Sequence, residues 1–156
     1  MFSVFFNNNG VCDHSKTKEQ FDSAHWAVIN HPLQLNIDEL SNTIKALLKS
    51  AQAEDDYLKA QKELIQQSLL ITKAKLYSSL RSTNYLVCMQ NASIIRYHAE
   101  YLRLSSHTLN ETEQFNKSYV AVFRQEMEEF RELFKVWVQE IKQMDKEELE
   151  DEWGLF

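Results

Sequence analysis

Glycine and proline are almost missing from this sequence, which has 156 residues but only Gly 2 and Pro 1. An average chain of this length holds about ten glycines and several prolines. Hairpins and phosphate-binding loops need glycine where φ is positive or where the backbone approaches a ligand. The sequence therefore predicts an all-α fold: an antiparallel bundle of about four or five helices with long, coiled-coil-like helices.

Other absences narrow the functional classes. The sequence has Cys 2, too few for a disulfide framework. No apolar run approaches the roughly 20 residues of a membrane span, and the start has no basic region typical of a signal peptide. We therefore expect a cytoplasmic protein without a membrane partner. A Gly-rich phosphate loop, G-x-S-x-G, C-x-x-C and H-E-x-x-H are all missing from the sequence, so no catalytic, cofactor-binding or metal-ligating residue is predicted.

A ferritin-like metal-binding enzyme is the first alternative. Such a bundle needs a glutamate from each of two helices and a Glu-x-x-His motif from each of the other two. Here Ile95 stands three residues before His98, and Leu104 stands three before His107, so this motif is missing at both histidines. The residues that this alternative would use are Asp22, His25, Glu54, His98 and Glu100.

The chain divides into an irregular N-terminal arm at 1–14, a single helical bundle domain at 15–149, and an acidic and aromatic C-terminal tail at 150–156. Apolar spacing and capping residues predict helices at 16–30, 37–81, about 84–106 and 111–149. His31-Pro32 ends the first of these, because the residue before proline avoids the α region.

The second predicted helix is unusually long. Apolar residues and one threonine recur every seven positions through it: Ile37, Ile44, Ala51, Leu58, Ile65 and Thr72. Because this phase continues through the acidic residues 54–56, the pattern favours one helix from 37 to 81. The alternative is a break near Ala53. Asn36 is the expected N-cap.

An apolar stripe marks the last predicted helix, and Asn110 with Glu113 resembles a capping box at its start. The large residues follow steps of three and four: Val120, Phe123, Met127, Phe130, Phe134, Trp137, Ile141 and Met144. Such a face usually packs into the core of its own chain. However, predicted helices of such unequal length cannot cover one another, so part of the stripe could instead bind a partner or a second copy of the chain.

The tail DKEELEDEWGLF adds aromatic residues after an acidic run, and we expect it to dock either on the bundle or on another protein. Together with the stripe, it gives the candidate interaction residues Phe130, Phe134, Trp137, Ile141, Trp153 and Phe156.

The net charge of −6 and the pI near 5.4 disfavour nucleic acid as a partner, although the basic stretch 59–103 keeps a nucleic-acid-binding bundle as a second alternative. The favoured hypothesis is a non-catalytic helical bundle that acts through protein–protein interaction, with a protein partner or as a homo-oligomer. One version is an acidic inhibitor, antitoxin or immunity-type protein that binds a basic target.

Overall fold

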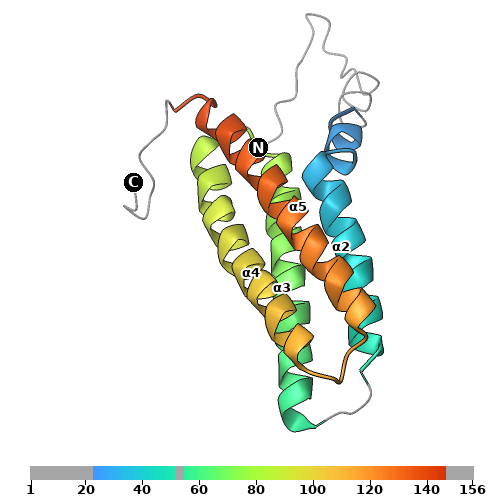
Figure 1. The fold of residues 1–156 in the computed structure, drawn as a ribbon. Helices are drawn as coiled ribbons and strands as arrows, with labels where there is room; N and C mark the ends of the chain where they lie inside the picture. Colours follow the sequence, from blue (N-terminus) through green and yellow to red (C-terminus); the bar gives the residue numbers. More distant parts are fainter. Residues whose placement is uncertain (1–22, 52–54, 147–156) are drawn as a thin grey trace, which may run out of the picture.

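The computed structural model describes residues 23–51 and 55–146. Within these ranges the chain forms helices and no strands, which confirms the predicted all-α class (Figure 1). The main helices are α2 (Pro32–Lys49), α3 (Asp56–Leu80), α4 (Tyr85–Glu111) and α5 (Lys117–Lys142), and residues 23–29 are also helical. The predicted arm at 1–14 and the tail at 150–156 lie outside the described residues.

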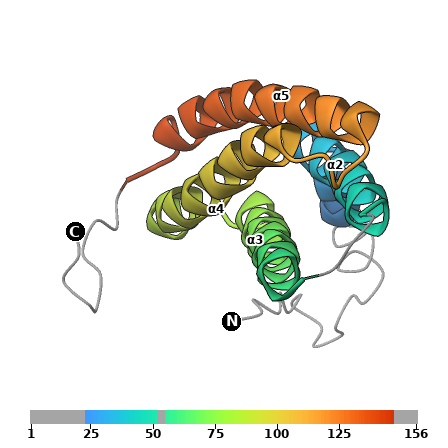
Figure 2. The same cartoon turned by 60° about the horizontal axis from the view of Figure 1, so that its bottom comes forward.

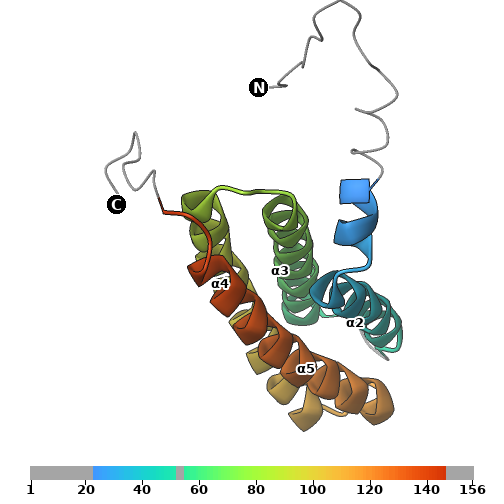
Figure 3. The ribbon, with the colours of Figure 1, turned by 90° about the horizontal axis from the view of Figure 1, so that it is seen from above.

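The four helices run up and down and follow one another round a common core, as the view along the bundle shows (Figure 3). α3 packs chiefly against α4, and α5 packs against both α4 and α2. α5 therefore lies across the bundle and bridges the two helices (Figure 2). α2 and α3, although consecutive, make less contact than the three other neighbouring pairs. No described helix is both long and apolar enough to span a bilayer.

The prediction of one helix from 37 to 81 is wrong. α2 ends at Lys49, where the Ser50 N–H bonds back to Ala46 O and Leu47 O. α3 begins after Asp55, whose side chain accepts a hydrogen bond from Leu58 N at 2.7 Å. The seven-residue spacing misled the prediction because two separate helices can keep the same apolar spacing on either side of a break. The capping residues, and the burial gained when the chain folds back, favour the break.

α2 also begins earlier than expected. Its N-cap is His31 rather than Asn36, and the His31 ring nitrogen Nδ1 accepts from Leu33 N at 3.2 Å. Pro32 occupies the first helical turn, where its fixed φ suits the helix and its missing N–H costs no hydrogen bond. The predicted end of the preceding helix at His31-Pro32 is confirmed. Asn36 is instead buried inside α2.

α5 begins later than predicted, at Lys117. Its N-cap is Asn116, which accepts from Ser118 N at 2.9 Å, so the expected capping box at Asn110 and Glu113 is wrong. The helices have 18, 25, 27 and 26 residues. α3, α4 and α5 match in length, whereas α2 is shorter, so the predicted mismatch between one very long helix and its neighbours does not occur among the described residues.

The α5 stripe faces the core, as expected for most of its length. Its buried members are Val120, Phe123, Met127, Phe130, Trp137 and Ile141. They meet a row from α2 that is fully buried: Leu33, Ile37, Leu40, Ile44 and Leu47. Phe134 is only partly buried at the edge of this core. Met144, the last member of the stripe, is also partly buried. The stripe therefore stabilises the bundle first, and its incompletely buried members are Phe134 and Met144.

Candidate functional site

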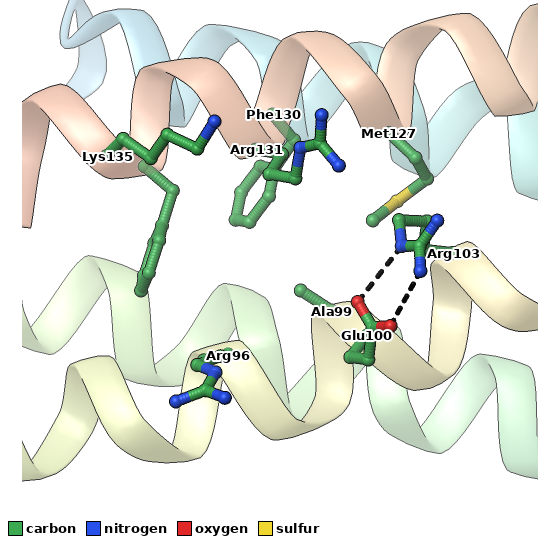
Figure 4. A pocket seen from close by; sticks show the side chains of 9 residues that line it. Arg96, Ala99, Glu100, Arg103, Met127, Phe130, Arg131 and Lys135 are labelled. Carbon is green, nitrogen blue, oxygen red and sulfur yellow. Dashed lines mark hydrogen bonds and ion pairs between the residues drawn. The ribbon is translucent and has the colours of Figure 1, made fainter.

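A groove runs along the surface between α4 and α5, where Phe134 reaches the edge of the core. It has a volume of about 250 Å³. Its lining residues, all but one labelled in Figure 4, are Arg96, Ala99, Glu100, Arg103, Met127, Phe130, Arg131, Phe134 and Lys135. We call this feature the α4–α5 groove.

Helical spacing explains why these residues gather there. Positions three, four and seven apart share one face of a helix. On α4 the groove residues lie at 96, 99, 100 and 103, and on α5 at 127, 130, 131, 134 and 135. Because the two helices are antiparallel neighbours, the two faces meet along their length.

The floor of the α4–α5 groove is apolar and largely aromatic. Phe130 and Phe134 stack with ring centroids 6.2 Å apart and planes at 22°. The Phe134 ring also meets Trp137, with centroids 5.7 Å apart. Phe130 is 2% exposed and fixed in the core, whereas Phe134 keeps accessible surface. Met127 and Phe130 point from α5 toward Ala99 on α4 (Figure 4). The floor is therefore an apolar surface made of core side chains, with an accessible aromatic ring.

The α4 rim carries a charge pair. Arg103 donates to Glu100 through both Nε and Nη2, at 3.0 and 2.7 Å (Figure 4). This two-point hydrogen bond lowers the pKa of the Glu100 carboxyl, so the group stays ionised. Arg96 lies one turn before Glu100 on α4. It is exposed and makes no hydrogen bond or ion pair with the described residues. The α4 rim thus offers one guanidinium that is already paired and one that is not.

The α5 rim carries two further cations, each with an acidic neighbour outside the groove. Arg131 Nη2 lies 2.9 Å from Glu128 Oε2, and Lys135 Nζ lies 2.7 Å from Glu132 Oε1. The Glu132 pKa is lowered, chiefly by its hydrogen bond with Lys135. Exposed pairs of this kind contribute little to stability because solvent screens them, so an incoming carboxylate can replace either glutamate at little cost.

The groove lining therefore has four cations against one acid. This local positive charge contrasts with the net charge of −6 of the whole chain. With its apolar floor, the site can hold a ligand that has both carboxylates and large apolar groups.

A second, shallower hollow adjoins the groove on the outer face of α4. It shares Arg96 and Glu100 with the groove and adds Ser93, Tyr97, Tyr101 and Leu104. Tyr97 is 74% exposed, and Leu104 is also exposed. The apolar surface therefore continues past the groove onto α4.

A different basic site lies between the end of α2 and the start of α3. Four of its residues are lysines, which we call the lysine cluster: Lys45, Lys49, Lys59 and Lys62. The other lining residues are Leu48, Glu63 and Gln66, so it has charge but almost no apolar floor. It lies at the end of the bundle where α5 begins, since Asn116 N bonds to Ser50 Oγ at 3.2 Å.

The candidate interaction residues predicted from the sequence differ in burial, and only one of the described ones keeps accessible surface in the groove. Phe130, Trp137 and Ile141 are buried, and Phe134 is the partly buried one that lines the groove. Trp153 and Phe156 lie outside the described residues. The sequence reasoning missed the rim cations, whose signal was the placement of Arg96 and Arg103 one heptad apart on one face of α4.

Two described residues of the metal-binding alternative have other partners. His98 Nδ1 lies 3.2 Å from Ser68 Oγ on α3, and Glu100 pairs with Arg103. Within 23–51 and 55–146 no three histidine, cysteine or acidic residues are grouped as metal ligands would be. Asp22 and Glu54 lie outside these ranges.

Comparison with known protein families, with curated proteins and with solved structures found no match to this chain. Any proposal about its function therefore rests on its own residues.

Proposed function

We propose that this chain is a cytoplasmic helical-bundle protein that acts by binding an acidic, apolar segment of another protein in the α4–α5 groove. The observation that carries the proposal is the pairing of an aromatic floor with a cationic rim in an otherwise acidic molecule. Peptide-binding grooves on helical proteins use the same two elements: apolar anchors for affinity and rim charges for orientation.

The positive charge of the groove favours an acidic partner segment, whereas the negative net charge of the whole sequence favours a basic partner. Net charge suggested a basic target, but the groove lining has four cations and one acid. Arg96 is the strongest point for a new contact, since it has no ion pair to exchange among the described residues. A planar guanidinium binds a carboxylate through two parallel hydrogen bonds.

The floor supplies the affinity in this proposal. A large apolar side chain that moves from water onto Phe134 and Met127 gains roughly 1.5–3 kcal/mol if it becomes fully buried. Two such anchors contribute about 3–6 kcal/mol, which is less than the about 8 kcal/mol of micromolar binding, and ordering of the segment offsets part of this gain. We therefore expect a weak complex.

Photo-crosslinking tests the proposal. Ser93 is exposed and lies one turn before Arg96, outside the groove lining. With p-benzoylphenylalanine in place of Ser93, irradiation of the cells that produce the protein should join it to segments of another protein that contain acidic and large apolar residues. Mass spectrometry of the joined peptides identifies their sequences.

The matched control carries the same photo-reactive residue in place of Lys59, in the lysine cluster. The Ser93 products should also fall in an R96Q/R131Q/K135Q variant and persist in K45Q/K49Q/K59Q, which removes the same charge. Joined segments that are basic, or that appear equally with the Lys59 probe, would overturn the proposal, as would the absence of any product with another protein.

A further inference from the structure

We infer that the α4–α5 groove has an internal competitor: residues 147–156 of the same chain, EELEDEWGLF, dock in it and must leave before a partner binds. This inference rests on the proposed function, since it concerns the regulation of the same site. Three observations support it: the composition of residues 147–156, the position of Lys146 at the end of the described chain, and the distance that the segment can span.

The segment has the composition that the groove selects. It contains five acids and four large apolar residues, namely Glu147, Glu148, Glu150, Asp151 and Glu152, with Leu149, Trp153, Leu155 and Phe156. The groove lining offers four cations around an apolar floor. Acidic and aromatic residues are adjacent in the segment, as cations and aromatic rings are in the groove, so both kinds of contact can form together.

The described chain ends beside the same pair of helices. The ammonium group of Lys146 lies over the Tyr85 ring, 5.3 Å from its centroid. Tyr85 is the first residue of α4, so the segment begins between the end of α5 and the start of α4. From there to the groove the surface keeps partly buried apolar side chains, including Met89 and Val138. The route to the groove is therefore short and follows the α4–α5 pair.

The segment is long enough for this route. Lys135 lies seven residues before the end of α5 at Lys142, about 10 Å along the helix at 1.5 Å per residue, and Lys146 stays near that end because its ammonium group lies over Tyr85. An extended chain advances about 3.3 Å per residue, so Trp153 can travel about 23 Å and come level with Lys135. Phe156 can travel about 33 Å and reach the level of Met127.

The lysine cluster does not compete for the segment. It lies at the opposite end of the bundle, where α2 and α3 join and α5 begins (Figure 1). α5 alone spans about 39 Å for its 26 residues, more than the segment can cover. The lysine cluster also lacks an apolar floor for Trp153 and Phe156. Reach and chemistry both select the groove.

The test uses the purified full chain with p-benzoylphenylalanine in place of Ser93, at submicromolar concentration. Irradiation should join Ser93's position to the peptide that contains residues 147–156. The same probe at Lys59 should give no such product. A mixture of ¹⁵N-labelled and unlabelled chains identifies the source. If the segment docks in its own chain, no product joins a labelled peptide to an unlabelled one, whereas docking in a second copy also gives such mixed products.

Variants of the segment and of the groove sharpen the result. W153A/F156A should abolish the product, because both apolar anchors are lost. R96Q/R131Q/K135Q should reduce it by about tenfold, since up to three exposed ion pairs are removed. K45Q/K49Q/K59Q, with the same change in charge, should leave it unchanged.

Each outcome separates the inference from the proposed function. No product with residues 147–156, a product insensitive to both W153A/F156A and the groove variant, or mixed-isotope products at the frequency of random pairing between chains would overturn the inference. The proposed function would still stand if the cellular experiment captured acidic, apolar segments of another protein. Conversely, W153A/F156A should increase that capture severalfold, and an unchanged or reduced capture would also contradict the inference.

Discussion

The α4–α5 groove and the lysine cluster are both basic sites on an acidic protein, but they differ in what lies beneath the charge. The groove sets arginines around a floor that belongs to the core, with Phe130 buried and Phe134 partly so. The lysine cluster has little besides Leu48 under its ammonium groups. Charge attracts a ligand in both places, but only the groove can also exclude water from it.

The comparison shows how one helix can serve both stability and recognition. α5 uses a continuous stripe for the core, and the edge of that stripe forms the groove floor. Recognition on such a surface adds little strain, because the apolar residues are already ordered by folding. The lysine cluster has no equivalent, since its long side chains must lose rotamer entropy on binding.

The largest expected effect is on stability, and it compares a buried residue of the groove floor with an exposed residue of the lysine cluster. Phe130→Ala should lower the free energy of unfolding by about 3–5 kcal/mol, because a buried ring is replaced by a cavity. Lys59→Ala, the comparison, should change it by less than about 0.5 kcal/mol at an exposed site. Urea unfolding followed by circular dichroism measures both, and equal effects would contradict the assignment of Phe130 to the core.

The accessible ring of the floor should show an intermediate effect. Phe134→Ala should cost about 2 kcal/mol, because a ring at the edge of the core gives up only part of its transfer free energy. The same urea titration gives the value. A loss as large as that of Phe130→Ala would mean that Phe134 is a core residue without an accessible face.

Rim charge should affect binding more than stability. In the W153A/F156A background, the anionic aromatic dye anilinonaphthalene sulfonate should bind the groove, and R96Q/R131Q/K135Q should weaken this binding about fivefold, or about 1 kcal/mol. K45Q/K49Q/K59Q should have no effect on the fluorescence titration. If both triple variants weakened binding equally, charge alone would explain the site.

The smallest expected effect concerns the opposite flank of α5, where it meets α2. Glu126 Oε1 accepts from Thr43 Oγ1 at 2.9 Å, while Glu126 Oε2 is buried and has no hydrogen-bond partner within 23–51 and 55–146. Burial raises the pKa of this carboxyl above its ordinary value of 4.5. The folded state therefore holds the proton to higher pH than the unfolded state, and this stabilising contribution is lost as pH rises from 4.5 through the folded pKa.

Glu126→Gln should accordingly stabilise the protein at neutral pH, by up to about 1 kcal/mol or a few degrees in Tm, because the amide needs no charge to accept from Thr43. The gain should shrink below the ordinary pKa of 4.5, where the wild-type carboxyl is protonated in both states. Thermal melts at neutral and acidic pH check this, and a destabilised variant at neutral pH would contradict it.

Much of the local structure was readable from the sequence because it depends on neighbouring residues. His31-Pro32 ends a helix through steric exclusion, and Asn84 caps α4 by accepting from Val87 N at 3.1 Å. The α5 stripe was readable for the same reason, since its period alone predicts one buried face. The start of α5 was not, because Asn110 and Asn116 are both good caps and only the packed bundle selects between them.

The candidate site was less predictable. Phe134 was identified from the stripe, but its partners across the groove were not. Arg96 and Arg131 are far apart in sequence, and no local pattern says that α4 and α5 pack with these faces together.

The sequence by itself determined that this protein is helical, where its chain breaks at proline, and which face of α5 is apolar, because each of these follows from steric limits and periodicity within a few residues. Only the tertiary structure decided that the chain folds back between Ser50 and Asp55, and that the exposed edge of the α5 stripe lies beside the α4 arginines. A heptad pattern is equally compatible with one long helix or two, and burial of both faces around a shared core selects the second.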